Sequence, residues 1–170
     1  MDLKLHIRDV PDFPTPGILF RDITPLLKHP PAFNFVIDQF SERYAQEPLD
    51  AIVAVEARGF LFGAPLACRL NKPLVLARKQ GKLPAASNRA EYSLEYGTNV
   101  VEVHKDGVTP GQRVLIVDDL LATGGTLAAA TNLVKQAGGL VQGIALVIEL
   151  TGLNGRNQLE GYDVFSLIQY

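Results

Sequence analysis

The chain has 170 residues, the usual length of one domain, and we see no linker or internal repeat in it. Apolar residues make up 47% and charged residues 20%, which excludes a disordered, collagen-like or low-complexity chain. The net charge is −2, without the basic excess of proteins that bind nucleic acid through its backbone. We therefore expect a single domain over residues 1–170.

Cysteine content and apolar run lengths indicate the compartment. Cys68 is the single cysteine, so an internal disulfide is excluded, and we interpret it as a buried thiol in a helix. The N-terminus, MDLKLHIRDV, lacks the apolar stretch of a signal peptide. The most apolar run, residues 144–148, is too short to cross a membrane. We expect a cytoplasmic protein.

The first 25 residues give mixed signals. Alternating apolar residues near the N-terminus fit a strand, but the spacing of Leu3, Ile7 and Val10 also fits a helix. We favour a helix over the first ten residues. Residues 11–25 carry several prolines, so they are predicted to be extended and irregular. Residues 18–20 are too apolar to lie in water, and the segment is expected to cover another part of the molecule.

Strands and helices are predicted to alternate along the body of the chain. Apolar runs predict strands over residues 51–55, 74–77, 114–117 and 144–148. None of these runs alternates with polar residues, which is typical of strands buried on both faces of a parallel sheet. Helices are predicted over residues 31–45 and 59–70, the second with a kink or delay at Pro65. A third helix is predicted to begin at the turn of residues 122–126 and to end at Gly138-Gly139. The pattern predicts an α/β fold with a single doubly wound parallel β-sheet flanked by helices.

Residues 80–103 interrupt this alternation. A polar loop is predicted over 80–90, and alternating apolar residues predict a β-hairpin that turns near residues 97–99. A hairpin among parallel βαβ units is an insertion, and long inserted loops are often lids. We expect a flexible loop and a hairpin lid in this segment.

The strongest chemical signal is the segment VLIVDDLLATGGT, residues 114–126. Asp118 and Asp119 follow a buried strand, where charge is costly unless it meets a ligand. The turn after them opens a helix, and its residues are Ala122, Thr123, Gly124, Gly125 and Thr126. Free N–H groups and the helix dipole favour an anion there, whereas an ordinary capped turn would leave the carboxylates unexplained. The pattern predicts a ribose 5-phosphate site, with phosphate on the turn and hydroxyls on the Asp pair.

This segment resembles the signature of the type I phosphoribosyltransferases, which bind 5-phosphoribosyl 1-pyrophosphate (PRPP). Four further segments, residues 17–22, 56–63, 78–97 and 165–170, narrow the resemblance to the adenine-specific members of the family. The resemblance implies a purine salvage enzyme that transfers the 5-phosphoribosyl group from PRPP to adenine, giving AMP and pyrophosphate. It also implies Mg²⁺ as the cofactor and a homodimer.

The resemblance assigns roles to individual residues. Glu95 matches the family's proposed catalytic acid/base, and residues 11–25 match a hood over the purine. Pyrophosphate binding is implied for Glu56, Ala57, Arg58, Arg78 and Lys82. Adenine binding is implied for Leu19, Phe20 and Arg21. No direct metal ligand is expected, because PRPP itself holds most of the Mg²⁺ coordination near Asp118 and Asp119. Family members often carry a cis peptide bond at the position of Glu56–Ala57.

The basic residues between positions 78 and 89 fit the same interpretation. Arg78, Lys79, Lys82 and Arg89 form a cluster that suits a polyanion, although a solvated surface loop would carry it too. A PRPP-binding regulator and a sister phosphoribosyltransferase that uses a 6-oxopurine remain as alternatives. The segment 17–22 argues against the second, again by resemblance.

Overall fold

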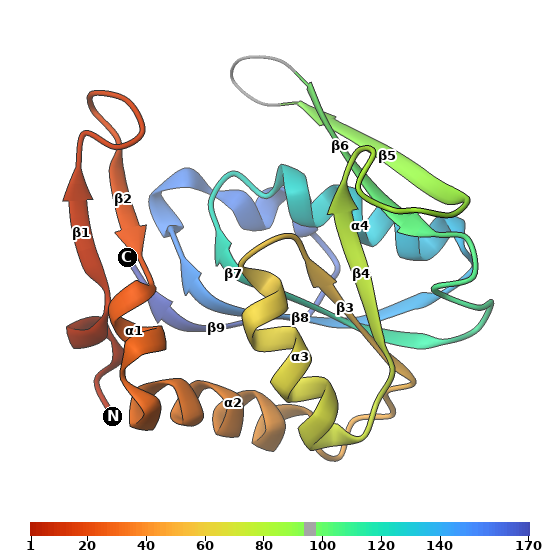
Figure 1. Ribbon diagram of the computed structural model, residues 1–170, viewed down its shortest axis with the longest axis horizontal. Helices are drawn as coiled ribbons and strands as arrows, with labels where there is room; N and C mark the ends of the chain where they lie inside the picture. Colours follow the sequence, from red (N-terminus) through yellow and green to blue (C-terminus); the bar gives the residue numbers. More distant parts are fainter. Residues whose placement is uncertain (94–97) are drawn as a thin grey trace.

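A seven-stranded sheet forms the centre of the structure, a computed structural model that describes residues 1–93 and 98–170 (Figure 1). Its strand order is β5-β6-β4-β3-β7-β8-β9, and the five strands from β4 to β9 in this order run parallel. The strands are β3 (Ala51–Val55), β4 (Leu74–Lys79), β5 (Ser87–Ser93), β6 (Thr98–His104), β7 (Arg113–Leu121), β8 (Leu140–Glu149) and β9 (Val164–Gln169).

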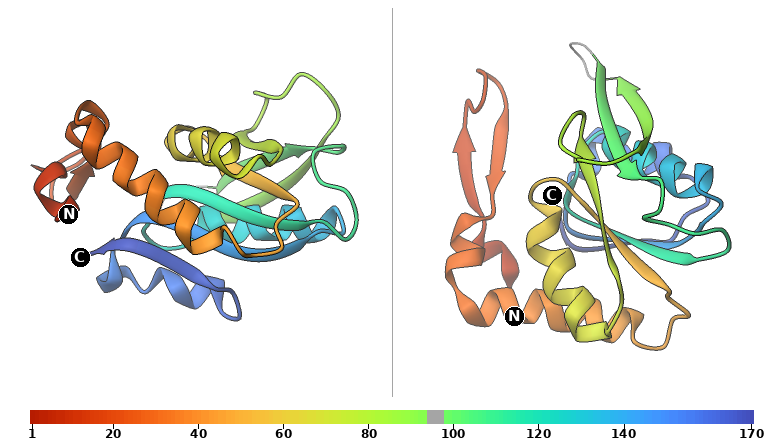
Figure 2. Two further views of the ribbon diagram at one scale, coloured as in Figure 1. Left: turned by 90° about the horizontal axis from the view of Figure 1, so that it is seen from below. Right: turned by 45° about the vertical axis from the view of Figure 1, so that its right-hand side comes forward.

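Helices cover both faces of this sheet, so the predicted doubly wound α/β fold is confirmed (Figures 1 and 2). The helices are α1 (Thr24–Lys28), α2 (Pro30–Tyr44), α3 (Gly59–Leu70) and α4 (Gly125–Gln136). One buried cluster joins α2 and α3 to the sheet, where Phe40 and Phe62 meet Leu115. A second cluster joins α4 to the opposite face, where Leu133 meets Ile116. Adjacent residues of β7 therefore bury their side chains in different clusters, as expected for a central parallel strand.

The helix predictions hold within a residue or two at most boundaries. Helix α2 buries Val36, Ile37, Phe40 and Tyr44, the stripe that the spacing predicts. Helix α3 continues through Pro65. Helix α4 ends where Gly138, at φ +80°, and Gly139 donate their N–H groups to the last turn, a Schellman motif.

Two predictions about burial are wrong. Strand β4 is not buried on both faces, because Leu74 and Leu76 remain 37% and 36% exposed. Its neighbour β6 pairs with Arg78 and Lys79 only, so among the described residues the first part of β4 has a strand, β3, along one edge alone and lies at the border of the sheet. The thiol of Cys68 is exposed rather than buried.

The N-terminal prediction also needs correction. Only Leu3–His6 form a short 3₁₀-helix, and β1 (Arg8–Pro11) follows where a helix was expected. Strand β1 pairs antiparallel with β2 (Leu19–Asp22), so the segment 11–25 is more regular than its prolines indicate. The paired residues lie about 8 to 14 positions apart, beyond the reach of a tight turn, and local spacing therefore does not reveal the pairing. The β1–β2 ribbon stands beside the main sheet (Figures 1 and 2).

The predicted hairpin exists, but its turn lies earlier than expected. Strands β5 and β6 pair antiparallel, with Ser93 opposite Thr98 and Tyr92 opposite Asn99. Thr98 and Asn99 are therefore strand residues, and the connection falls on residues 94–97, outside the described residues. Strand β5 begins at Ser87, which shortens the predicted loop of 80–90. Within the described part of the chain, no helix has the length and apolar character needed to span a membrane.

Gly63 provides a test of the packing between α3 and β3. A Cβ at Gly63 would lie 2.5 Å from the Cβ of Ala54, closer than two carbon atoms can pack. Gly63→Ala is therefore expected to lower the free energy of unfolding by about 1–3 kcal/mol through overpacking, although Ala normally favours a helix interior. Denaturant unfolding measures the change. Ala64→Gly, at an exposed position of the same helix, reports the propensity effect alone, and a more stable Gly63→Ala variant would contradict the packing.

Candidate active site

The Asp pair occupies a central and largely buried strand of the sheet, β7. Asp118 and Asp119 are 8% and 3% exposed, respectively. The sequence indicated that the carboxylates follow the end of the strand. Strand β7 instead extends to Leu121, so both carboxylates lie within it. Glu56 follows the end of the neighbouring parallel strand β3, which places it at the same sheet edge.

Burial and mutual repulsion make the pair costly to ionise. Burial, and next the charge of Asp119, raise the pKa of the Asp118 carboxyl well above its usual value. Burial also raises the pKa of Asp119, although Arg58 opposes the rise. The Asp119 N–H donates a 2.8 Å hydrogen bond to Oδ1 of Asp118, and the Arg58 Nε lies 3.0 Å from Oδ2 of Asp119. Two acidic groups are thus available to accept hydroxyl hydrogen bonds from a ligand.

The turn that follows β7 supplies free backbone N–H groups. Gly124 adopts φ +90° immediately before α4, a conformation that favours glycine. The first N–H groups of α4 have no partner within the helix and carry the positive end of its dipole. A cavity of 280 Å³ brings this turn together with both carboxylates and the loop after β3. Its lining includes Glu56, Ala57, Arg58, Asp118, Asp119, Ala122, Thr123, Gly124, Gly125 and Thr126.

The loop after β3 connects this cavity to the basic cluster. The Glu56–Ala57 peptide bond is cis, as the resemblance implies. The guanidinium of Arg78 donates to the Glu56 carboxylate at 3.2 and 3.1 Å, and these bonds lower the pKa of Glu56. Arg78 also donates to the carbonyl oxygen of Lys82 at 3.0 Å. Neither Arg78 nor Lys82 lines the cavity, whereas Lys79 does.

The basic cluster is therefore less available to an anion than its sequence indicates. Arg89 lies 2.6 Å from the buried carboxylate of Glu102, so its charge is already paired within the hairpin. Glu102 also accepts the N–H of Gly81 at 3.0 Å and holds the start of the loop. These contacts join β6 to β5 and to the loop after β4, and no sequence pattern identified them.

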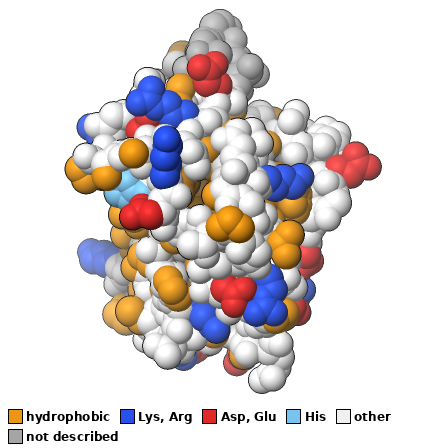
Figure 3. All heavy atoms as spheres, turned by 90° about the vertical axis from the view of Figure 1, so that its right-hand side faces the viewer, with side chains coloured by type: hydrophobic (Ala, Val, Ile, Leu, Met, Phe, Trp, Pro, Cys, Tyr) orange, Lys and Arg blue, Asp and Glu red, His pale blue; other side chains and the backbone are white. Residues whose placement is uncertain are grey.

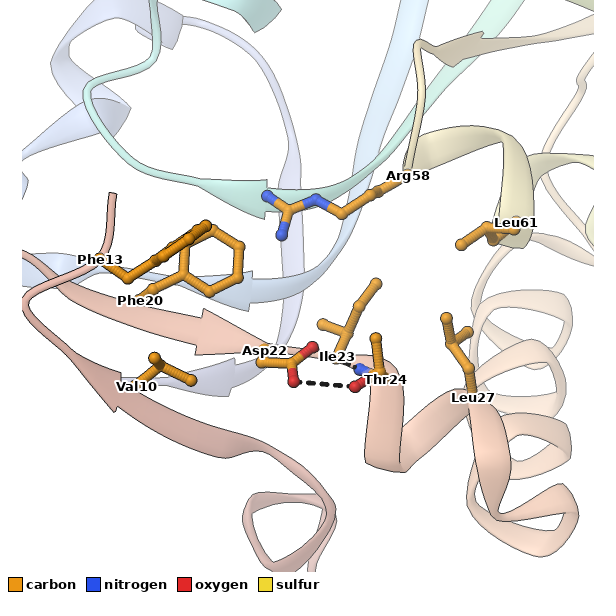
Figure 4. A pocket seen from close by; sticks show the side chains of 9 residues that line it. All are labelled: Val10, Phe13, Phe20, Asp22, Ile23, Thr24, Leu27, Arg58 and Leu61. Carbon is orange, nitrogen blue, oxygen red and sulfur yellow. Dashed lines mark hydrogen bonds between the residues drawn. The ribbon is translucent and has the colours of Figure 1, made fainter. Parts of the chain in front are cut away.

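A second, apolar cavity of 460 Å³ lies between the N-terminal ribbon and α3. Phe20 lines it and contacts Phe13 edge to face, with ring centres 5.1 Å apart (Figure 4). The sequence singled out Phe20 but missed the rest of this lining. Those residues are Val10, Phe13, Asp22, Ile23, Thr24, Leu27 and Leu61. Their only signal is that several are apolar residues in a segment rich in proline.

Leu19 and Arg21 do not line this apolar cavity. The Leu19 side chain is 43% exposed. Arg21 forms an ion pair with Asp9 and stacks over the ring of Tyr170, 3.7 Å from its centre. Any contact of these two residues with a base would come from their backbone, as the resemblance also implies. Glu95 lies outside the described residues.

Arg58 joins the two cavities and contributes to the lining of each. Its guanidinium carbon lies 5.2 Å from the centre of the Phe20 ring (Figure 4). Its Nε lies beside Asp119. Tyr92 and Asn99 of the hairpin complete the polar cavity and were not identified from the sequence. Their strand positions are predictable, but nothing in their residue types marks a site.

Comparisons with known proteins agree with this geometry. A model of the phosphoribosyl transferase domain matches residues 23–168. The adenine phosphoribosyltransferase of Chloroflexus aurantiacus is 58% identical over 169 residues, 99% of this chain and 98% of that protein. The crystal structure of the enzyme from Thermoanaerobacter pseudethanolicus has a TM-score of 0.96 at 54% identity, covering 99% of this chain and 98% of that one.

A third relative was crystallised with two ligands. The adenine phosphoribosyltransferase of Saccharomyces cerevisiae, crystallised with adenine and an imino-altritol bisphosphate, has a TM-score of 0.92 at 42% identity. The match covers 98% of this chain and 96% of that one. This chain belongs to the phosphoribosyl transferase family. Within that family its full-length likeness is to the adenine enzymes, and it transfers the 5-phosphoribosyl group from PRPP to adenine, giving AMP and pyrophosphate.

The electrostatics of the Asp pair predict the effect of removing one charge. Raised carboxyl pKa values mean that the ionised pair destabilises the folded state at neutral pH. Asp119→Asn is therefore expected to abolish AMP synthesis while the melting temperature stays equal or rises. The stability advantage should shrink as pH falls and the wild-type pair becomes protonated.

Thermal unfolding at several pH values and an AMP assay check this expectation. Asp38→Asn, which alters an ion pair with Arg69 at the surface, serves as the control and should retain activity. A large drop in the melting temperature of Asp119→Asn would instead assign the pair a structural role.

Proposed function

We propose that the polar cavity holds PRPP, that the apolar cavity holds adenine, and that Arg58 stands where the two meet. The observation that carries this proposal is that Arg58 lines both cavities. Asp118 and Asp119 accept hydrogen bonds from the ribose hydroxyls, and the turn of residues 122–126 binds the 5-phosphate. The adenine ring stacks on Phe20, in a pocket that offers mostly apolar contacts.

Pyrophosphate is the leaving group in this arrangement. The loop of Glu56, Ala57 and Arg58 faces the polar cavity and can bind it through backbone and guanidinium groups. Arg78 and Lys82 add positive charge nearby, and Arg78 must exchange its bonds to Glu56 for bonds to the anion. Lys79 lines the cavity directly and joins this set.

The reaction breaks the bond between ribose C1 and the pyrophosphate oxygen, and a nitrogen of adenine forms the new bond to C1. The transition state carries positive charge on the ribosyl group, which the carboxylates of Asp118 and Asp119 stabilise. Most of the remaining acceleration comes from holding the two substrates in line. Glu95 accepts the proton that adenine loses, a role that rests on the resemblance.

The carboxylates present fit the expected cofactor. Mg²⁺ usually binds proteins through one or two carboxylates and completes its shell with water and substrate phosphates. In the described part of the chain, no three His, Cys, Asp or Glu side chains gather to form a metal site. Asp118 and Asp119 lie beside the proposed diphosphate position and suit an ion that PRPP brings with it. When bound, Mg²⁺ neutralises negative charge on the departing pyrophosphate.

We further propose that the chain forms a homodimer in the cytoplasm. The exposed apolar side chains of Leu74 and Leu76 and the groove around Cys68 lie on the side of α3 and β4 and offer an apolar surface for a second copy. Sedimentation at several concentrations tests the dimer. The absence of any possible internal disulfide in a chain with one cysteine suits a reducing compartment.

A single assay separates the activity from its alternatives. Radiolabelled adenine, hypoxanthine and guanine are offered in turn with PRPP and Mg²⁺, and nucleotide formation is measured. Adenine alone should react; reaction with hypoxanthine or guanine would indicate the 6-oxopurine enzyme. A regulator that only binds PRPP would form no nucleotide at all. Acidic and basic side chains are interspersed over the coloured part of the face in Figure 3, which does not resemble a nucleic-acid surface.

Phe20→Leu tests the position of the base. Loss of a stacked ring costs about 1–3 kcal/mol for a bound nucleobase, so the KM for adenine should rise about 5- to 150-fold. The KM for PRPP should stay close to the wild-type value. Phe35→Leu on α2, away from both cavities, is the matched control. An unchanged KM for adenine in Phe20→Leu would exclude stacking on this ring.

Glu95→Gln tests the proposed proton acceptor. General acid–base catalysis contributes roughly 10²–10⁴-fold, so kcat should fall within that range while the KM for PRPP changes little. Steady-state kinetics with varied PRPP measure both constants. Glu91→Gln, an exposed glutamate earlier on the same hairpin, controls for loss of charge in this segment. A Glu95→Gln enzyme with most of its kcat intact would remove Glu95 from the mechanism.

A further inference from the structure

A buried carboxylate lies at the end of β8, outside both cavities. Glu149 is 4% exposed, and Arg156 donates to both of its oxygens, from Nε at 2.6 Å and from Nη2 at 2.7 Å. Ser166 donates a further bond of 2.7 Å from the neighbouring strand β9. The remaining Arg156 nitrogen, Nη1, donates to the carbonyl oxygen of Val164 at 3.1 Å. Arg156 thus fixes the short 3₁₀-helix Gly155–Leu159 against the ends of β8 and β9.

The residue next to Arg156 lies directly against the turn that opens α4. A Cβ added to Gly155 would collide with the carbonyl oxygen of Ala122, and one added to Gly124 would collide with the carbonyl oxygen of Gly155. A Cβ on Gly124 would also lie 2.9 Å from the Cβ of Gln158. The two backbones are therefore in contact, and neither glycine has a side chain to separate them.

We infer that Arg156 is a positioning residue for the anion-binding turn, acting through Gly155 to set the affinity for PRPP. This inference rests on the proposed assignment of the 5-phosphate to residues 122–126. The turn binds its anion through backbone N–H groups, so its geometry depends on what supports it from behind. Arg156 supports it through the rigid, two-point contact that a guanidinium makes with a carboxylate.

Stability alone does not explain this arrangement well. The Glu149 carboxylate loses its hydration on burial, while the Arg156 side chain remains 45% exposed, so the ion pair adds little net stability. An arginine–carboxylate fork does provide direction, since its hydrogen bonds form in only one relative orientation. A shift of about 1 Å in a group that positions a substrate can reduce rates by about 10²-fold. A contact that fixes the orientation of the turn would therefore help it to hold a phosphate in position.

Arg156→Lys tests the inference, because lysine keeps the charge but loses the fork. The KM for PRPP, and its dissociation constant by calorimetry, should rise about tenfold, a cost of about 1.4 kcal/mol, while the KM for adenine stays within about twofold. Glu149→Gln, which weakens the same fork from the other side, should move the same constants in the same direction. Melting temperatures are measured for both.

Arg113→Lys is the matched control. Arg113 forms the same two-point fork with Asp50, at 2.8 and 2.9 Å, but lies at the first residue of β7, the opposite end from the cavity. The Arg113→Lys enzyme should lose about as much stability as the Arg156→Lys enzyme and keep its affinity for PRPP. Equal effects of Arg156→Lys and Arg113→Lys on the PRPP constants would overturn the inference. So would an unchanged affinity in Arg156→Lys. If Arg156→Lys fails to fold, Glu149→Gln decides by the same criteria.

One further variant separates this inference from the assignment on which it rests. Thr126→Ala removes a hydroxyl from the turn itself and should weaken PRPP binding if the turn holds the phosphate. If Thr126→Ala weakens PRPP binding and Arg156→Lys does not, only the positioning role is overturned. If neither variant changes PRPP binding, the phosphate assignment and the inference are both overturned.

Discussion

The cost of two adjacent buried carboxylates shapes the rest of the active site. Asp118 and Asp119 lie on the central strand β7, and burial raises the pKa of each. The charge of Arg58 and hydrogen bonds from backbone N–H groups offset part of that cost. Gly59 allows Arg58 to lie this close to the pair. A Cβ at Gly59 would lie 2.7 Å from the Val117 carbonyl oxygen, so only glycine lets α3 begin this near to β7. The protein keeps a charge arrangement that destabilises the empty fold and that a bound ribose can use.

The sequence predicts the central strands and helices better than the N-terminal ribbon and the exposure of β4. Buried strands such as 51–55 and the helix 30–44 follow local periodicity, so they could be predicted almost to the residue. The β1–β2 ribbon could not, because each strand depends on a partner about 8 to 14 residues away, beyond an irregular segment rich in proline. The exposure of Leu74 on β4 could not either, since a run of apolar residues does not reveal which neighbours cover it.

The candidate site divides in the same way. The Asp pair and the turn of residues 122–126 are contiguous in sequence, and parallel-strand geometry already places Glu56 at the same edge. The partners of the basic residues could not be predicted. Arg89 and Arg78 look free in the sequence, yet the fold pairs them with Glu102 and Glu56. A sequence shows which residues are basic. The fold determines which of these charges are already paired and which can bind a ligand.

The end of the chain links the two substrate sites. The Tyr170 N–H donates to the Glu149 carbonyl oxygen at 3.0 Å, and its ring lies under Arg21 of the N-terminal ribbon. Thr151 donates to the Tyr170 carbonyl oxygen at 2.6 Å and closes the contact. In the proposed assignment, Glu149 supports the phosphate turn through its side chain and the ribbon over the base through its backbone. Because one strand end anchors both, a displacement there would move the two proposed substrate sites together, which favours keeping their separation constant.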